Sequence, residues 1–510
     1  MKQRTSDLLF FALLLCLLLL TSGGHLVVGD EETMFRVTQN LVSGRDLAVG
    51  RETLTLPAQS NSLFLPATTL ELPTTSAVTG RDGKLFSKYA LGLSLLAVPL
   101  YLLGQGLAAV SGAATAGDAA RLWVSFLNPL ALAGCGWLLL RFSRAFGFRQ
   151  STGRWLALAF VFASMAWPYA KTFYPQPALT FLLLWLVYAC CRWRWQPSGA
   201  KETAIAAAAA GIVLVRPSEA ILLPLVGIYL LWAAPHHRHW RAVSALTIGT
   251  LFALLVTAWY NWYRFGSLLQ TGYHEIAWTT PPVLGLYGLL VSPGKGILLY
   301  APLLVLALGA WPLFARRHRR EALLFGGLWL ALLAFYAPYN FWTGGFNWGP
   351  RFLLPVLPFG LLPIGSLLDQ PGSRPWLAKV IFLLLFGLGV CLQLPAVLAD
   401  QSRYLYQHIA GRDEAQAYAE TIYNLPDSPL VRQWPIALEL LTAYAQPEVR
   451  QEAAEAMTSL SMGTSTQDIP NESQLLQDEF KRQNTPDFWW YHLYLRRQAS
   501  GRGPSSPTSH

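Results

Sequence analysis

The sequence is poor in charge, in acidic residues and in cysteine for a chain of 510 residues. Only 13% of the side chains are charged and 53% are hydrophobic, whereas soluble domains carry about a quarter charged residues. The five cysteines lie inside apolar runs and show neither a disulfide framework nor metal-ligand spacing. These shortages exclude a soluble enzyme, a disulfide-rich secreted domain and a disordered chain, and they indicate a membrane protein.

The charges that are present divide the chain near residue 399. The first 398 residues carry 29 of the 38 Lys and Arg but only 14 of the 28 Asp and Glu. No stripe of basic residues interleaved with aromatics occurs, so no nucleic-acid partner is expected. We predict a membrane-embedded domain over 1–398, with a first outer loop at 29–121. An extracytoplasmic tail follows over 399–510, mainly helical with a disordered end.

Twelve apolar runs reach or approach the length of about 20 residues that a spanning helix needs. They are 8–28, 89–111, 122–140, 155–170, 176–191, 203–216, 219–233, 242–260, 296–314, 322–338, 352–368 and 378–397. Loops rich in arginine alternate with loops that hold one basic residue, which is the positive-inside pattern. Lys2 and Arg4 place the N-terminus in the cytoplasm as well, and parity then requires that 89–111 does not cross. We therefore predict an outer-face juxtamembrane or re-entrant helix at 89–111, about 11 spans, and the tail outside. A cleaved signal peptide is the alternative interpretation of residues 1–28.

The interiors of these spans also lack acidic residues, which argues against an ion-coupled carrier. No Ser-His-Asp set and no phosphate-binding glycine loop occurs. Polar residues gather instead in four segments of the predicted outer face. Three acids open the first segment, Asp30, Glu31 and Glu32. They either favour the N-terminus of a helix that Asp30 caps, or hold a general base for a hydroxyl acceptor.

The other three segments offer cations and aromatic rings. Residues 80–89 contain Lys84 and Lys88, which share a face if the segment is helical. These lysines either lie at lipid headgroups or bind a phosphate. The loop 260–296 contributes Arg264, Tyr273, His274 and Lys295, and residues 339–352 contribute Trp348 and Arg351. An interfacial anchor, a surface histidine and an aromatic belt are the plain alternatives here. Binding of a sugar by aromatic faces and of a phosphate by Arg351 is the functional one.

These segments make the sequence similar to the integral-membrane glycosyltransferases of the GT-C superfamily. The resemblance is to the bacterial phospholipid-carrier-dependent group, which is related to protein O-mannosyltransferases and to the lipid A aminoarabinose transferase. It rests on the acidic pair after the first span, Gly83 to Gly92, Tyr263 to Ser267, Leu290 to Gly296, and Gly344 to Phe352. It covers roughly residues 5–400.

The resemblance implies an all-α polytopic membrane protein in the plasma membrane. It further implies a polyprenyl-phosphate-sugar donor and transfer outside the cytoplasm with inversion, to a glycan, lipid or protein acceptor. Asp30 would be the base, assisted by Glu31, and the cations Lys84, Lys88, Arg264, Lys295 and Arg351 would receive the leaving phosphate. Tyr273, His274 and Trp348 complete the candidate substrate-binding set. Some relatives bind a divalent metal here, so the resemblance leaves a metal cofactor open.

Two other functions are compatible with the same features. A transporter or flippase of lipid-linked sugar would show internal repeats, and we find none. A non-catalytic subunit that binds lipid-linked glycan would tolerate loss of Asp30.

Overall fold

The computed structural model describes the membrane-embedded region almost throughout. The described residues are 2–26, 29–49, 53–55, 71–73, 77–111, 116–233, 239–273, 277–345, 347–369, 375–400, 403–404, 408, 412–443, 446 and 487–491. Helices dominate, and the described strands form two short antiparallel pairs, β1–β2 and β3–β4. The predicted disordered end, Gly501 to His510, lies outside the described residues.

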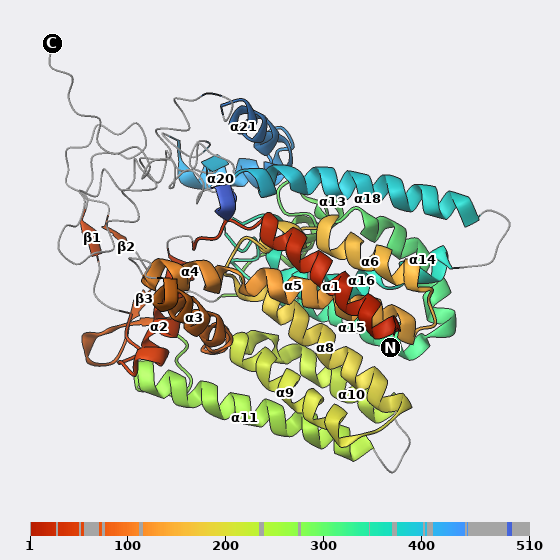
Figure 1. Ribbon diagram of the computed structural model, residues 1–510, viewed down its shortest axis with the longest axis horizontal. Coiled ribbons are helices and arrows are strands. Elements are labelled where there is room, and N and C mark those ends of the chain that lie inside the picture. Colours follow the sequence, from red (N-terminus) through yellow and green to blue (C-terminus); the bar gives the residue numbers. More distant parts are fainter. Residues whose placement is uncertain are drawn as a thin grey trace.

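Long helices run side by side and form the body of the molecule (Figure 1). They are α1 (Lys2–Leu20), α5 (Leu127–Ala145), α6 (Gln150–Phe162), α8 (Pro175–Trp195), α9 (Gly199–Val215), α10 (Leu223–Ala233), α11 (His239–Phe265), α14 (Leu303–Arg317), α15 (Arg319–Tyr336) and α18 (Pro375–Leu398). Shorter elements connect them: α7 (Ala166–Tyr169), η2 (Pro217–Leu222), α12 (Pro282–Val291) and α13 (Ile297–Tyr300).

One end of this body carries a layer built from residues 29–125, which include the predicted first outer loop 29–121. Its elements are α2 (Asp30–Ser43), β1 (Thr53–Thr55), β2 (Glu71–Pro73), β3 (Ala77–Thr79), η1 (Arg81–Gly83), β4 (Leu85–Ser87), α3 (Gly92–Ser111) and α4 (Ala116–Ser125). The tail adds α20 (Glu414–Tyr423) and α21 (Pro429–Ala443). In Figure 1, α3 is seen close to end-on while α8, α11 and α18 run across the view, so α3 lies across the long helices. Whether α3 enters the membrane stays a prediction.

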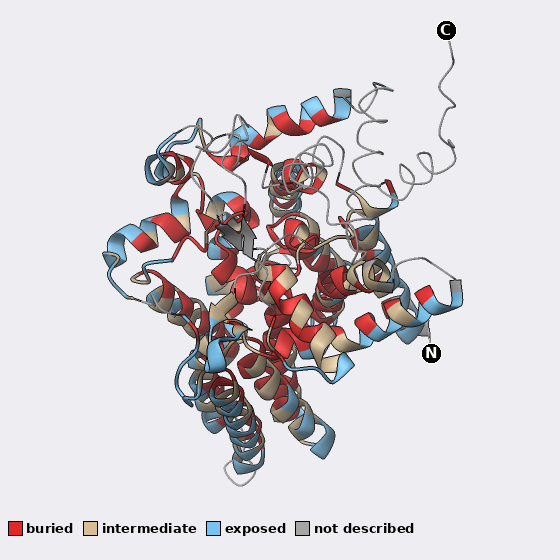
Figure 2. Ribbon diagram, turned by 90° about the vertical axis from the view of Figure 1, so that its left-hand side faces the viewer, coloured by how far each residue is buried: buried red, intermediate tan, exposed pale blue. Residues whose placement is uncertain are grey.

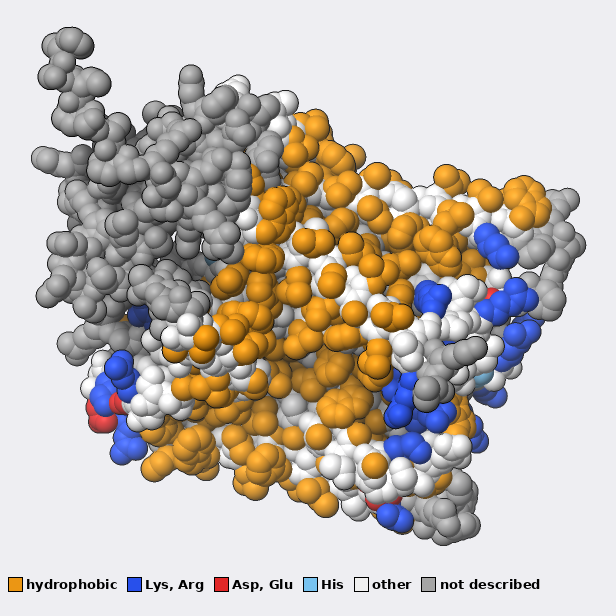
Figure 3. Space-filling view, viewed as in Figure 1, with side chains coloured by type: hydrophobic (Ala, Val, Ile, Leu, Met, Phe, Trp, Pro, Cys, Tyr) orange, Lys and Arg blue, Asp and Glu red, His pale blue; other side chains and the backbone are white. Residues whose placement is uncertain are grey.

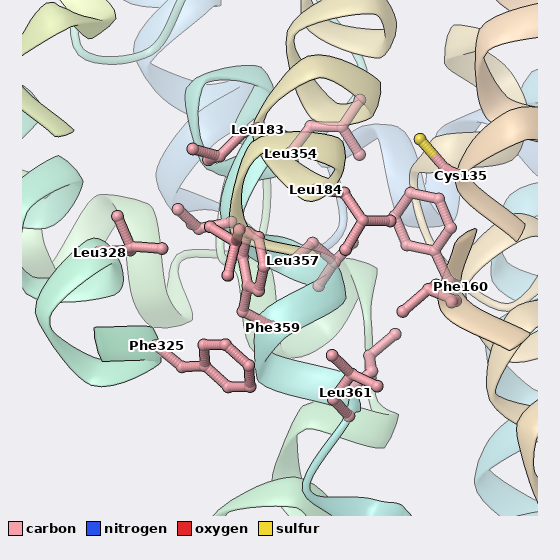
Figure 4. Packing of buried hydrophobic residues seen from close by; sticks show 14 of the residues in the cluster. Cys135, Phe160, Leu183, Leu184, Phe325, Leu328, Leu354, Leu357, Phe359 and Leu361 are labelled. Carbon is pink, nitrogen blue, oxygen red and sulfur yellow. The ribbon is translucent and has the colours of Figure 1, made fainter. Parts of the chain in front are cut away.

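The core lies where α6, α8, α14 and α15 surround a broken segment. That segment consists of η3 (Arg351–Val356), α16 (Leu357–Leu361) and α17 (Ile364–Leu368), and 94% of it is buried. Phe160, Leu184 and Leu357 pack together there (Figure 4). A chain with interrupted helical hydrogen bonds is tolerated at this depth only because protein covers it. Toward the outside, exposed residues lie along the outward faces of the helices (Figure 2).

The surface has the distribution of a membrane protein. An apolar band covers the middle of the face in Figure 3, and Lys and Arg gather at the end where the N-terminus lies. Six helices of the described part are long and apolar enough to cross a membrane, with α3 among them by these two criteria. Several of the twelve predicted runs are short or broken helices, and the count of about 11 spans is not confirmed. The all-α membrane architecture is confirmed.

Candidate functional site

The acidic segment begins helix α2 at the end of the molecule that carries the outer-loop layer. Gly29 is the N-cap and makes no side-chain capping bond, so Asp30 is the first helical residue. The interpretation of Asp30 as the helix cap is therefore wrong. The opposite face of α2 is apolar and packs against α3 through Met34 and Phe35, which fixes where the helix begins. As a result Glu31 is only 1% exposed, and Asp30 is half-buried.

Glu32 differs from the other two acids because it is held in an ion-pair network. Arg121 of α4 lies 2.9 Å from its carboxylate and Arg36 lies 3.2 Å away. Burial raises the pKa of Glu32, but the hydrogen bonds and charges of Arg121 and Arg36 outweigh burial and lower it below its usual value. Glu32 is thus held by two arginines, and the carboxylates that face the rest of the site are Asp30 and Glu31.

Tyr89 lies between strand β4 and helix α3, and its side chain contacts Asp30. Burial raises the pKa of Tyr89, and the charge of Asp30 and a hydrogen bond to Asp30 raise it further. A phenol keeps its proton in such surroundings, so the Tyr89 hydroxyl is the donor. The backbone here is fixed by Arg264, the buried last-turn arginine of α11. Its guanidinium donates to the carbonyls of Ser87 and Tyr89 and to Asn261 Oδ1 at 2.7 Å.

Lys88 and Arg351 lie on the aromatic rings that surround the carboxylates. The Lys88 ammonium is 5.4 Å from the ring centre of Tyr89 and 5.8 Å from that of Tyr273. The Arg351 guanidinium is 5.1 Å from the ring centre of Tyr174. Burial raises the pKa of Tyr174, Glu31 raises it further, and Arg351 opposes the rise. The Tyr174 hydroxyl is therefore within electrostatic reach of both the acid and the arginine.

A glycine-rich turn holds Arg351 in place. Gly344 has φ +70°, and a Cβ at that position would lie 2.8 Å from Arg351 Nε, so a glycine is required for the close approach. Among the described residues, Arg351 Nε has no hydrogen-bond partner although it is buried. Lys295 fastens the same turn by donating to the carbonyls of Gly345, at 2.8 Å, and Asn347. Burial lowers the pKa of Lys295 well below its usual value, and the nearby charge of Arg351 lowers it further.

The structure places the sequence-predicted residues in three groups. Asp30, Glu31, Lys88, Tyr273, Lys295 and Arg351 come together, and the Tyr273 hydroxyl is within electrostatic reach of Asp30 and Arg351. Arg264 and Trp348 lie inside the protein: the Trp348 indole donates to Gln393 Oε1 at 2.7 Å and its ring contacts Tyr300 edge-on. His274 lies outside the described residues.

Lys84 forms the third group, away from the carboxylates. It is exposed and pairs with Asp46 at 2.5 Å, and the hydrogen bond with Asp46 raises the pKa of Lys84. Residues 84–88 do not form the helix that would put Lys84 and Lys88 on one face. The left-handed Asp82, φ 57°, and Gly83 make a turn between β3 and β4, and Lys88 follows the second strand.

Three residues outside the predicted set contribute to the site: Tyr89, described above, Tyr174 and Arg216. Tyr174 precedes the proline that begins α8, and Arg216 ends α9 with its guanidinium 4.6 Å from the ring centre of Phe352. The charge of Arg216 also opposes the rise in pKa that burial causes at Tyr273 and Tyr339. In the sequence, Arg216 belongs to one of the loops that hold a single basic residue, and it is not among the predicted site residues. Its position as a single basic residue at the sparsely charged face was the signal that could have identified it.

A group with metal-ligand chemistry lies near the start of the tail. Ligand atoms of His25, Asp400 and Asp487 all lie within 4.8 Å of one another. However, the Lys171 ammonium is 2.9 Å from Asp487 Oδ2, and His25 Nε2 is 2.7 Å from Oδ1. Both carboxylate oxygens of Asp487 therefore have protein partners, and the arrangement fits an ion-pair network that ties the tail to His25 and Lys171 better than a cation site. Asp30 and Glu31 form no three-ligand group with other described residues.

Comparison with known proteins identifies the fold. No family model matches the sequence, and no curated protein matches it significantly. Similar solved structures include ArnT from Cupriavidus metallidurans bound to undecaprenyl phosphate, with a TM-score of 0.50 at 14% identity over 90% of this chain and 81% of that chain. The apo form of ArnT gives 0.48 at 15% identity over 92% and 82%. An apo oligosaccharyltransferase of Archaeoglobus fulgidus gives 0.48 at 10% identity over 83% and 60%. The likeness to the undecaprenyl-phosphate-bound form shows the GT-C fold, as the sequence predicted.

Proposed function

We propose that this protein is an integral-membrane glycosyltransferase. It transfers a sugar from a polyprenyl-phosphate-linked donor to a hydroxyl of a glycan, lipid or protein acceptor at the outer face of the plasma membrane. The GT-C fold and the carboxylate and cation groups at one end of it support the proposal. The ArnT structure of that fold contains undecaprenyl phosphate, and the same carrier chemistry suits the cations found here.

The observation that carries the proposal is the arrangement around Tyr89 and Tyr174. Asp30 accepts a hydrogen bond from the Tyr89 hydroxyl, the Arg351 guanidinium lies over the Tyr174 ring, and the charges of Glu31, Arg351 and Asp30 all act on the Tyr174 hydroxyl. A glycosyl transfer needs a base on one side of the anomeric carbon and positive charge on the other, where the phosphate leaves. The site brings an acid and a cation to the same tyrosines, and we propose that the sugar and its phosphate lie between them.

In the proposed reaction, the carboxylate acts as the base and the cations bind the phosphate. Asp30 takes the proton of the acceptor hydroxyl, and the acceptor oxygen forms a bond to the anomeric carbon. The bond from that carbon to the phosphate oxygen breaks, and its electron pair leaves with the polyprenyl phosphate. Arg351 and Lys88 stabilise the charge on the leaving phosphate, and Lys295 holds the turn that carries Arg351. Attack opposite the leaving group inverts the anomeric carbon.

The test replaces Asp30 with Asn, alone and together with Glu31→Gln, and measures sugar transfer from polyprenyl-phosphate donors in membranes. Asp46→Asn is the matched control, because it makes the same chemical change at an exposed carboxylate of the same outer loop. We expect Asp30→Asn to lose transfer at least 100-fold while donor binding persists, since a positioned general base contributes roughly 10²–10⁴-fold.

Each other outcome has a definite meaning. Unchanged transfer in Asp30→Asn moves the chemistry away from α2 and contradicts the proposal. Absence of transfer by the unmutated protein with a broad set of donors, with binding retained, supports a carrier or a non-catalytic binding subunit instead.

A further inference from the structure

An open groove of about 810 Å³ lies between α1 and α6, at the end of the molecule opposite the candidate site. Both helices begin at this end, at Lys2 and Gln150. Helix α1 rises about 1.5 Å per residue, so its 19 residues separate the groove mouth from the outer end by most of a bilayer's hydrocarbon thickness. The groove is thus a feature of the membrane domain distinct from the carboxylate site.

The lining of the groove changes from polar to apolar with depth. Polar groups come from the first turns of the two helices: Thr5, Ser6, Ser151 and Arg154. The deeper walls are apolar, with Leu9 and Leu13 on α1 and Trp155 and Leu158 on α6. By the helical rise, Leu13 lies about 10 Å further along the axis than Ser6. A ligand that matches this gradient has a polar head at the mouth and a hydrocarbon chain along the helices.

Arg154 is the charged group at the mouth, and its hydrogen bonding is incomplete. Its Nη2 donates to Ser6 Oγ at 2.6 Å, and its guanidinium lies 6.0 Å from the ring centre of Phe10. Its Nε is buried and has no partner among the described residues. A guanidinium that lines the groove with a hydroxyl beside it is suited to a phosphate.

The carboxylates near the mouth have protein partners, although Asp7 Oδ1 is buried without one among the described residues. Asp7 of α1 pairs with Arg144 of α5. Asp369 accepts the backbone N–H of Arg149 and the hydroxyl of Thr152, each at 2.7 Å. In the described part of the chain no carboxylate lies within ion-pair distance of Arg154. Lys and Arg also crowd this end of the surface in Figure 3, which attracts anions.

We propose that the groove between α1 and α6 is a binding site for one anionic phospholipid of the leaflet at the N-terminal end. Arg154 and Ser6 bind the phosphate, and one acyl chain lies between Leu9 and Leu13 on one side and Trp155 and Leu158 on the other. The donor of the proposed reaction is a different ligand, because its phosphate must reach Asp30 at the far end. The site is independent of the proposed function.

The test uses native mass spectrometry of the full chain released from nanodiscs of dioleoylphosphatidylglycerol or dioleoylphosphatidylcholine. We expect one retained phosphatidylglycerol per chain and about tenfold less phosphatidylcholine. Arg154→Gln reduces the retained phosphatidylglycerol about tenfold. Arg141→Gln is the matched control, because Arg141 belongs to the same basic region but stacks on Trp137 and does not line the groove. Leu13→Trp fills the deep part of the groove and should also expel the lipid, with thermal unfolding in detergent confirming that each variant is folded.

Four results would overturn the assignment. The first is equal retention of the two lipids, and the second is retention in folded Arg154→Gln equal to that of the unmutated chain. The third is displacement of the lipid by a polyprenyl phosphate that itself requires Arg154, which would assign the groove to the donor. The fourth is loss of phosphatidylglycerol on adding millimolar inorganic phosphate, together with normal retention of phosphatidylglycerol by Leu13→Trp. That result would show that the site binds only the phosphate group, and it would contradict the lipid assignment.

Discussion

The hydroxyl of Tyr89 donates a hydrogen bond to the carboxylate of Asp30. The two residues belong to different parts of the first outer loop, Asp30 to the start of α2 and Tyr89 to the connection between β4 and α3. An acceptor that approaches Asp30 therefore meets a carboxylate whose orientation is set by a neighbouring ring. If Asp30 is the base, the hydrogen bond from Tyr89 aligns it.

Replacing Tyr89 with Phe tests that alignment. The ring and its packing remain while the donor to Asp30 is lost, so we expect kcat for sugar transfer to fall about 10- to 100-fold. The KM for donor should change less than about threefold, because phosphate contacts are untouched. Steady-state kinetics in detergent, with donor concentration varied, separates the two. A higher KM with normal kcat would instead make Tyr89 a donor-binding residue.

Arg264 is expected to act through the backbone that it holds rather than on substrate. Its guanidinium donates to the carbonyls of Ser87 and Tyr89, on either side of Lys88. Lysine keeps the charge but not the planar fork, so Arg264→Lys should lower kcat and cost about 1–3 kcal/mol of unfolding free energy.

The double variant distinguishes positioning from direct contact with the donor. If Arg264 acts by placing Tyr89, its effect on kcat should shrink when Tyr89→Phe is already present. Fully additive effects on kcat would contradict this role.

Glu32→Gln should reduce stability and leave the chemistry in place. The ion pairs with Arg121 and Arg36 lower the pKa of Glu32 in the folded state relative to its ordinary value of 4.5. Stability from such a group is present above the unfolded pKa and is lost as the pH falls through the folded pKa. We expect Glu32→Gln to unfold more easily than the parent at pH 7, by about 1–3 kcal/mol.

The pH dependence provides the check on that interpretation. The difference in thermal unfolding between Glu32→Gln and the parent should shrink as the pH is lowered below about 4.5. Sugar transfer by the variant at pH 7, measured below its melting temperature, should stay within about threefold of the parent. Loss of transfer comparable to that of Asp30→Asn would mean that Glu32 shares the base function.

The sequence predicted the membrane architecture because hydropathy and arginine placement are local properties of the chain. It also located the acidic pair, Lys88, Tyr273, Lys295 and Arg351 in segments that the structure brings together. It did not separate Glu32 from Asp30 and Glu31, because the partner that distinguishes them, Arg121, lies in a helix far along the chain.

The local structure around Lys84 was also out of reach. Spacing of four residues suits a helix, yet the turn at Asp82 and Gly83 makes the segment a hairpin. Trp348 was a candidate to stack on a sugar ring. Only its hydrogen bond to Gln393, which lies in α18, shows that it is part of the buried core. Side-chain type was predictable in these cases, and the long-range partner was not.

Arg351 and Lys84 show most clearly what the structure adds to the sequence, because the sequence suggested both as phosphate ligands. Arg351 lies in the site with its Nε buried and without a partner among the described residues, and Gly344 leaves room for it. Lys84 is 52% exposed and pairs with Asp46.

We therefore expect Arg351→Lys to weaken binding of polyprenyl phosphate at least tenfold, because a lysine cannot offer two parallel donors to one phosphate. Lys84→Gln, the control, should bind within about twofold of the parent. Equilibrium binding of a fluorescent polyprenyl phosphate in nanodiscs measures both. If Lys84→Gln weakens binding as much as Arg351→Lys does, the phosphate site extends to the β3–β4 turn. The conclusion that Arg351 binds phosphate and Lys84 does not would then be wrong.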